Sequence, residues 1–170
     1  MPIMNRRRLL YAQRCHLQGG AGAAAYAGLG DTVPANVYGY WGLRAYSLAT
    51  IGNNVVRLRR ASDDTESNFV SLAGGALDVA SIATFITSTT GWVTKLYDQS
   101  GQTNANPTGP IDAAQTDHTK QPQLILSGVG TRAVMRFTGA EYLVSPNLVS
   151  NSVQPYSIPY AAKRPGTASG

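Results

Sequence analysis

Residues 55–60 read VVRLRR, and this short stretch decides the fold class. Val56 and Leu58 fall on one side of an extended chain, whereas Arg57 and Arg59 fall on the other. Such alternation with a period of two is typical of a β-strand with one buried face. The polar residues 62–64, SDD, follow directly and are expected to form a turn. The stretch therefore predicts a β-rich module.

The region after this strand predicts one helix and three more strands. Asp78 is a good N-cap, and apolar residues follow it at the i, i+3, i+4 and i+7 spacing of an amphipathic helix, which Gly91 ends. The polar stretch 102–121 is expected to be a loop. Strands are expected at residues 92–97, 123–126 and 133–137. Trp92, Tyr97 and Phe137 are the candidate core aromatics.

The composition limits the class of protein. Charged residues make up only 14% of the 170 residues, and 18 Gly and 9 Pro indicate many turns and few long helices. The single cysteine, Cys15, forms no internal disulfide, which excludes a disulfide-stapled domain. Its neighbour His16 and the distant His118 are too few for a metal site, so no metal and no cofactor is expected. No apolar run approaches the roughly 20 residues of a membrane span.

Three zones are expected along the chain. Residues 1–44 form an irregular, basic and glycine-rich arm that lacks the apolar periodicity to fold alone. Residues 45–143 form the β-rich module. Residues 144–170 are rich in Ser and Pro, with a candidate strand near residues 156–160, and form a linker or the start of further strands.

The formal net charge of +5 comes largely from two arginine clusters, Arg6, Arg7, Arg8 and Arg14 in the arm and Arg57, Arg59 and Arg60 in the module. Such clusters contact nucleic acid or an acidic protein surface, or they are solvated charges on a terminus and an edge strand. The solvated interpretation is favoured, because no aromatic residues interleave with the arginines. Nucleic acid is therefore not expected as the main partner.

Seven short segments, in order, carry a family resemblance: AYSL from 45, VRLRRASDD from 56, GALDVA from 75, GWVT from 91, YDQSG from 97, QPQ from 121 and AVMRF from 133. Together they resemble the N-terminal part of the catalytic domain of fungal-type α-L-arabinofuranosidase B. They look even more like related modules of bacteriophage and prophage virion proteins. The resemblance implies a mainly β fold, an antiparallel concanavalin A-like jelly-roll sandwich, incomplete within this chain, with one short helix and an extended N-terminal arm.

The same segments have structural explanations. The DQSG sequence at 98–101 predicts an Asx-type turn that uses the conformational freedom of Gly101. A minority interpretation makes Asp98, Gln99 and Trp92 contacts for a glycan. The resemblance implies that the catalytic carboxylates of the arabinofuranosidases lie in the later half of their domain, and no carboxylate of this chain matches them. We therefore expect no catalysis by this chain, because a glycosidase needs two carboxyl groups at the scissile bond.

The leading functional hypothesis is a structural subunit of a bacteriophage virion appendage, such as a tail fibre, a head fibre or a collar, assembled in the host cytoplasm and located on the particle surface. Its expected partners are other virion proteins, further copies of itself and a cell-surface glycan. The candidate anchoring residues are Arg6, Arg7, Arg8, Tyr11, Arg14, Tyr38 and Trp41. The alternatives are the N-terminal part of an arabinofuranosidase-like glycoside hydrolase with its catalytic residues beyond residue 170, and a carbohydrate-binding module.

Overall fold

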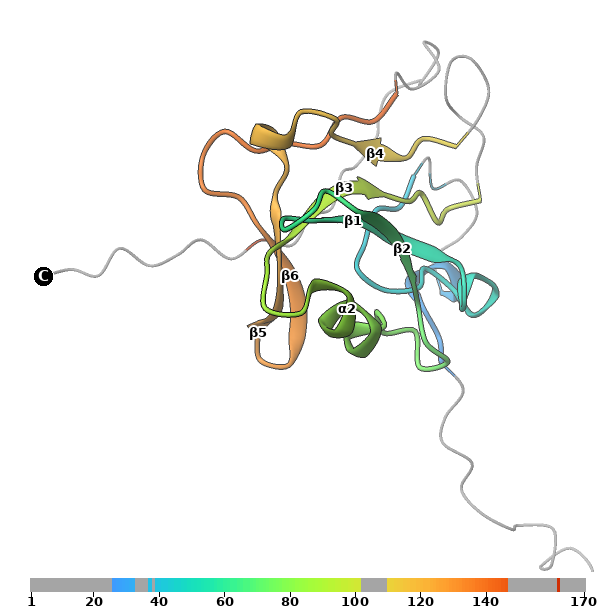
Figure 1. Cartoon of the computed structure of the whole chain (residues 1–170). Coiled ribbons are helices and arrows are strands. Elements are labelled where there is room, and N and C mark those ends of the chain that lie inside the picture. The colour runs from blue at the N-terminus through green and yellow to red at the C-terminus, as the bar shows by residue number, and fades with distance from the viewer. Residues whose placement is uncertain (1–25, 33–36, 38, 102–109, 147–161, 163–170) are drawn as a thin grey trace, which may run out of the picture.

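The computed structural model describes residues 26–32, 37, 39–101, 110–146 and 162. These residues form one antiparallel sheet of six strands, in which five strands follow the order β2-β1-β3-β5-β6 and β4 pairs with β3 (Figure 1). The strands are β1 (Asn54–Arg60), β2 (Glu66–Val70), β3 (Gly91–Leu96), β4 (Ala113–Ala114), β5 (Gln123–Val129) and β6 (Arg132–Arg136). The expected mainly β antiparallel class is confirmed, and this sheet is consistent with a jelly-roll-like sandwich.

The first strand lies inside the sheet, between β2 and β3. Arg57 is opposite Asn68 of β2 and Lys95 of β3, and Leu58 is opposite Ser67 and Val93. The pairing of β1 with β3 shifts between Arg57 and Leu58, which marks a bulge. The expectation that the arginines of this stretch sit on an edge strand is therefore wrong, because β2 covers the edge that the sequence left open.

The α-helix α2 (Val79–Ile86) lies against one face of the sheet (Figure 1). The Asp78 side chain caps it by accepting a hydrogen bond from the Ser81 amide at 3.1 Å, as the sequence predicts. Phe85 packs its ring 5.4 Å from that of Phe69 and holds the helix to β2. The helix also brings Ile82, which is fully buried, into the core.

The core is the layer between this helix and the sheet. Its buried members come from every named strand except β6, from the helix and from Leu77 just before it, and all but Phe69 are aliphatic: Val55, Val56, Leu58, Phe69, Leu77, Ile82, Val93, Leu96, Ala113 and Leu124. Phe137 is not among them, because its side chain is 51% exposed just after β6. The interpretation of Phe137 as a core aromatic is therefore wrong, and Trp92 and Tyr97 are only half-buried.

Three short 3-10 helices complete the described fold: η1 (Leu29–Asp31), η2 (Leu48–Thr50) and η3 (His118–Lys120). The first belongs to the arm predicted from the sequence, and it docks on the module through a hydrogen bond from the Gly30 amide to the Tyr46 carbonyl at 2.8 Å. The candidate strand near residues 156–160 lies outside the described residues.

Candidate functional site on the polar side of the sheet

A polar groove of about 190 Å³ runs over β1, β2, β3 and β4. Its lining is made almost entirely of hydrogen-bonding side chains: Arg57, Glu66, Thr94, Lys95, Ala114, Gln115, Thr116 and Gln121. The bulge in the pairing of β1 with β3 explains this, because Leu58 and Val93 belong to the core while the shift in register places both Thr94 and Lys95 beside Arg57 in the groove. We refer to this feature as the groove.

One side of the groove is organised around Asn68 of β2. Its side-chain carbonyl oxygen accepts a hydrogen bond from the Arg57 guanidinium at 2.8 Å and another from the Tyr97 hydroxyl at 2.8 Å. The same guanidinium lies 3.7 Å from the Glu66 carboxylate. The Arg57 charge is thus held in a fixed place, and it is partly neutralised at the rim.

The other side is organised around Asp112. This carboxylate lies 3.3 Å from the Lys95 ammonium group and accepts a hydrogen bond from the Asp98 amide at 2.9 Å. The Lys95 nitrogen also lies 5.3 Å from the centre of the Tyr97 ring, close enough for a cation–π contact. Both cations of the groove therefore have an acidic partner, which leaves the groove polar but nearly neutral.

The end of the groove at Gln121 continues into a buried polar cluster. Gln121 accepts a hydrogen bond from the Arg59 guanidinium at 2.8 Å and donates one to the Gln115 carbonyl at 3.0 Å. Arg59 has only 6% of its surface exposed, and its guanidinium reaches out to the Asp64 carboxylate at 2.5 Å. Arg59 is therefore a structural arginine, whereas the sequence indicated solvated charge.

The predicted Asx-type turn at residues 98–101 is present. The Asp98 carboxylate accepts a hydrogen bond from the Ser100 amide at 3.0 Å, and Gly101 takes a positive φ of 75°. The same carboxylate also accepts a hydrogen bond from the Tyr40 amide at 2.8 Å. Asp98, a candidate glycan contact, thus ties the arm to the end of β3.

Gln99 extends this tie into the interior. Its side-chain oxygen accepts a hydrogen bond from the Tyr46 amide at 3.2 Å, and its side-chain nitrogen donates to the carbonyls of Gly42 at 3.1 Å and Arg44 at 3.0 Å. Only 4% of Gln99 is exposed. We call Asp98 and Gln99 the latch, because together they bond four backbone groups between residues 40 and 46.

The remaining candidate residues are scattered. Trp92 lies on β3, half-buried, opposite Arg59 and Gln123. Trp41 is 36% exposed, and its indole nitrogen donates a hydrogen bond to the Ile111 carbonyl at 2.8 Å. The anchoring candidates Arg6, Arg7, Arg8, Tyr11, Arg14 and Tyr38 lie outside the described residues.

All nine carboxylates of the sequence lie in the described part of the chain, and each has a local partner. Ion pairs or hydrogen bonds with nearby side chains or backbone amides hold Asp31, Asp63, Asp64, Glu66, Asp78, Asp98, Asp112, Asp117 and Glu141. Four of them show what these bonds do to the proton affinity. Hydrogen bonds from Arg60, Ser81 and Thr119 lower the pKa values of Asp63, Asp78 and Asp117, in that order.

The fourth is Glu141, whose side chain accepts hydrogen bonds from the hydroxyl and the amide of Thr138. These bonds lower its pKa to about 2. A general acid of a glycosidase needs the opposite change, a pKa raised toward neutrality. The four carboxyl groups are therefore set up as structural acceptors.

Within the described residues, no group of three or more His, Cys, Asp or Glu side chains is arranged to hold a metal ion. None of the helices in that part of the chain is long and apolar enough to cross a membrane.

The antiparallel sheet with a helix on one face and a polar groove defines a mainly β module that is consistent with a jelly-roll-like sandwich. The family model of the catalytic domain of α-L-arabinofuranosidase B matches residues 35–139, which is more than half of the chain. The chain belongs to this family. No curated protein and no solved structure gives a significant match. Because the family is one of glycoside hydrolase catalytic domains, the expected lack of activity stays a prediction.

The sequence reasoning missed the groove. Only part of its signal was present: alternation puts Arg57 on the polar side of β1, but in β3 it puts Lys95 on the same side as the buried Val93. The bulge that brings Lys95 beside Arg57 leaves no mark in the sequence. What the sequence lacked was Asn68, because the polar segment that contains it was not recognised as a strand. Without β2 and β4, the positions of Glu66, Ala114 and Gln115 beside the two cations could not be foreseen.

Proposed function

We propose that this chain is a non-catalytic module, and that its setting is a structural subunit of a bacteriophage virion appendage such as a tail fibre, a head fibre or a collar. The observation that carries the proposal is the engagement of all nine carboxylates in local hydrogen bonds or ion pairs. A hydrolase of this family keeps two carboxyl groups available for the glycosidic bond. Here the carboxylates stabilise turns, strands and the arm.

The virion setting is supported by the order of the seven family segments, which looks most like that of phage and prophage modules. A basic arm is the natural anchor, because Arg6, Arg7, Arg8 and Arg14 can pair with acidic surfaces of other virion proteins. The latch is consistent with this role. Its hydrogen bonds connect residues 40–46 to the end of β3, so a force applied to the arm would be transmitted to the sheet.

The groove is the surface we assign to contact with uncharged glycans. The exposed Thr116 and the partly exposed ion pairs of Arg57 and Lys95 offer hydrogen bonds to sugar hydroxyls, and this pairing leaves little net charge. The side-chain amides of Gln115 and Gln121 are already bonded within the protein and shape the floor of the groove. Tyr97 stands at its edge, with its hydroxyl bonded to Asn68.

The test is mass spectrometry of particles purified by density gradient from a lysate. We expect peptides of this chain in intact particles at a copy number in fixed ratio to other appendage proteins. A variant in which Arg6, Arg7 and Arg8 are changed to Gln should be depleted from particles, and Arg132→Gln, a single charge removed from β6, should be incorporated normally. Recovery of the chain only in the soluble fraction would refute the virion setting.

A second candidate is a glycoside hydrolase, and the match to a catalytic family favours it. In that case the groove would carry the substrate, and Glu66 and Asp112, the carboxylates that pair with its cations, would be the residues to remove. Hydrolysis of an aryl arabinofuranoside that Glu66→Gln or Asp112→Asn abolishes would favour this candidate over the structural one.

A further inference from the structure

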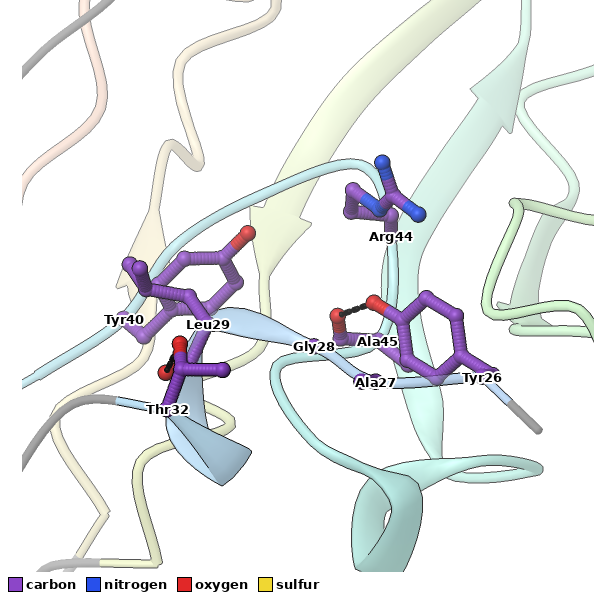
Figure 2. Close-up of a pocket in the computed structure, with 8 residues that line it drawn as sticks. All are labelled: Tyr26, Ala27, Gly28, Leu29, Thr32, Tyr40, Arg44 and Ala45. Carbon is purple, nitrogen blue, oxygen red and sulfur yellow. Dashed lines mark hydrogen bonds between the residues drawn. The ribbon is translucent and has the colours of Figure 1, made fainter. Parts of the chain in front are cut away.

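A second hollow lies where the arm crosses the module. Unlike the groove, it contains a cation, Arg44, that has no acidic partner among the described residues. It measures about 260 Å³, and its lining includes Tyr26, Leu29, Thr32, Tyr40, Arg44 and Ala45. Figure 2 shows Tyr26 and Tyr40 at two sides of the arm backbone at Gly28, with Arg44 above Tyr26. We refer to this feature as the arm cavity.

Hydrogen bonds fix the walls of the arm cavity. The Tyr26 hydroxyl donates to the Ala45 carbonyl at 2.5 Å, as Figure 2 shows. The Gly28 amide donates to the Asp31 carboxylate at 2.8 Å, and the same carboxylate accepts a hydrogen bond from the Leu48 amide at 2.8 Å. Because both walls are held before any ligand arrives, binding there would cost little ordering of the chain.

Arg44 is the group that sets this cavity apart. Its guanidinium lies 5.2 Å from the centre of the Tyr26 ring, and its side chain makes no hydrogen bond or ion pair with the described residues. By contrast, Arg57, Arg59 and Arg60 each pair with a carboxylate. No Asp or Glu lines the arm cavity, and the Asp31 carboxylate in its wall is bonded to the amides of Gly28 and Leu48, so Arg44 has no acidic partner among the described residues.

Tyr40 supplies the second uncommitted group. Its ring lies 4.8 Å from that of Tyr46, and its hydroxyl makes no hydrogen bond with the part of the chain that the structure describes. Burial raises the pKa of this hydroxyl, so it stays a neutral donor and acceptor at physiological pH. Leu29, which is 49% exposed, adds an apolar surface beside these polar groups.

We propose that the arm cavity binds a sugar residue that carries a carboxylate. The planar guanidinium of Arg44 fits a carboxylate with two parallel hydrogen bonds, and the site has no competing acid. The Tyr40 hydroxyl bonds a sugar hydroxyl, and Leu29 with the tyrosine rings covers the apolar face of the sugar ring. The volume is slightly below the roughly 300–1,000 Å³ of sites for drug-sized ligands, which suits a single ring.

The test is a titration of the isotope-labelled full chain by NMR, with the methyl glycoside of glucuronic acid as the probe. We expect saturable shifts at Tyr40, Arg44 and Ala45 with a dissociation constant of about 1 mM. Methyl glucoside, which lacks the carboxylate, and acetate, which lacks the ring, should each bind at least about tenfold more weakly. A parallel titration with N-acetylneuraminic acid compares the two dissociation constants and so shows whether the cavity prefers a uronic acid or a sialic acid.

Two variants test the named contacts. Arg44→Gln should weaken glucuronide binding about tenfold or more, and Tyr40→Phe severalfold, with the remaining amide spectrum unchanged in both. The matched control is Arg132→Gln, which removes the same charge from an exposed arginine of β6, outside the cavity, and should bind as the parent does.

Three results would overturn the proposal: no saturable shift at 50-fold excess over the expected constant of about 1 mM, equal binding of methyl glucoside, or equal loss in Arg44→Gln and Arg132→Gln. Shifts caused by a peptide with a free C-terminal carboxylate but by no sugar would assign the cavity to a protein partner instead. The result is independent of whether the chain is found in particles, so this proposal and the virion proposal fail separately.

Discussion

The groove and the arm cavity are of similar size and differ in how their charges are used. In the groove, Arg57 and Lys95 each have an acidic neighbour, at 3.7 Å and 3.3 Å. In the arm cavity, the one contact of the Arg44 guanidinium within the described part of the chain is with the face of the Tyr26 ring. The charges of the groove are therefore paired within the fold, whereas Arg44 has no acidic partner among the described residues.

This contrast between the groove and the arm cavity shows that residue type alone does not identify a ligand contact in this module. Asp98 and Gln99 looked like ligand contacts in the sequence because they are polar and follow a strand. Their side chains bond backbone groups of the arm, which gives both residues a structural role, and a sugar contact by either of them stays a prediction. Arg44 carried no sequence signal, because an isolated arginine in a loop has no pattern.

The largest loss of stability is expected from a change in the latch, which supports one wall of the arm cavity. Gln99→Leu removes one buried and two partly buried hydrogen bonds, those to the Tyr46 amide and to the carbonyls of Gly42 and Arg44. We expect a loss of about 3 kcal/mol in the free energy of unfolding, measured by urea denaturation. Gln123→Leu on β5 is the control and should change stability by less than about 0.5 kcal/mol.

The buried cluster beside the groove gives the next largest effect. Arg59→Leu leaves the Gln121 side chain without its donor in a buried position, and we expect a loss of about 2 kcal/mol. Arg57→Leu on the same strand removes a pair whose partners are largely exposed, and it should cost less than about 1 kcal/mol. Equal losses in the two variants would mean that burial does not distinguish these arginines.

The smallest expected effect is a loss of folding stability at low pH, caused by Glu141, which lies near the groove. Glu141 caps the turn before Tyr142, whose carbonyl accepts a hydrogen bond from Gln115 of the groove. Its pKa is lowered from 4.5 to about 2 in the folded chain, so its contribution to stability is complete above about pH 4.5 and is lost as the pH falls toward about 2.

Urea denaturation at pH 6, 4, 3 and 2 measures this effect. The parent chain should lose stability across the interval, and Glu141→Gln should show a smaller decline between pH 4.5 and 2. Glu66→Gln, in which an exposed carboxylate of β2 is neutralised, is the control. A decline of unchanged size in Glu141→Gln would show that other carboxylates cause it.

Local sequence patterns predicted the elements in which polar and apolar residues alternate or form a helical stripe. Residues 55–60, 92–97 and 133–137 were recognised as strands, and the observed elements Asn54–Arg60, Gly91–Leu96 and Arg132–Arg136 differ by a residue at their ends. The helix Val79–Ile86 was found with its Asp78 cap. In each case the sequence itself alternates or carries an apolar stripe, which leaves a visible period even though the observed burial departs from it at the bulges of β1.

The pattern failed where burial does not follow a period. In strand β2, ESNFV, only the Phe69 side chain is buried, and β4 has only two residues, too few to show alternation. Both are held by pairing with a neighbour rather than by their own propensity. The site depended on these two strands and on contacts between positions up to 62 residues apart, such as Arg59 with Gln121, which no local pattern contains.

The measurement that tests the central claim most directly is the hydrolysis of 4-nitrophenyl α-L-arabinofuranoside by the purified chain, followed for a day at several pH values between 4 and 8. The nine carboxylates are engaged in local bonds, so we predict release of nitrophenol no faster than in buffer. Turnover that Glu66→Gln or Asp112→Asn abolishes, in variants with unchanged stability, would contradict the account and make the groove an active site.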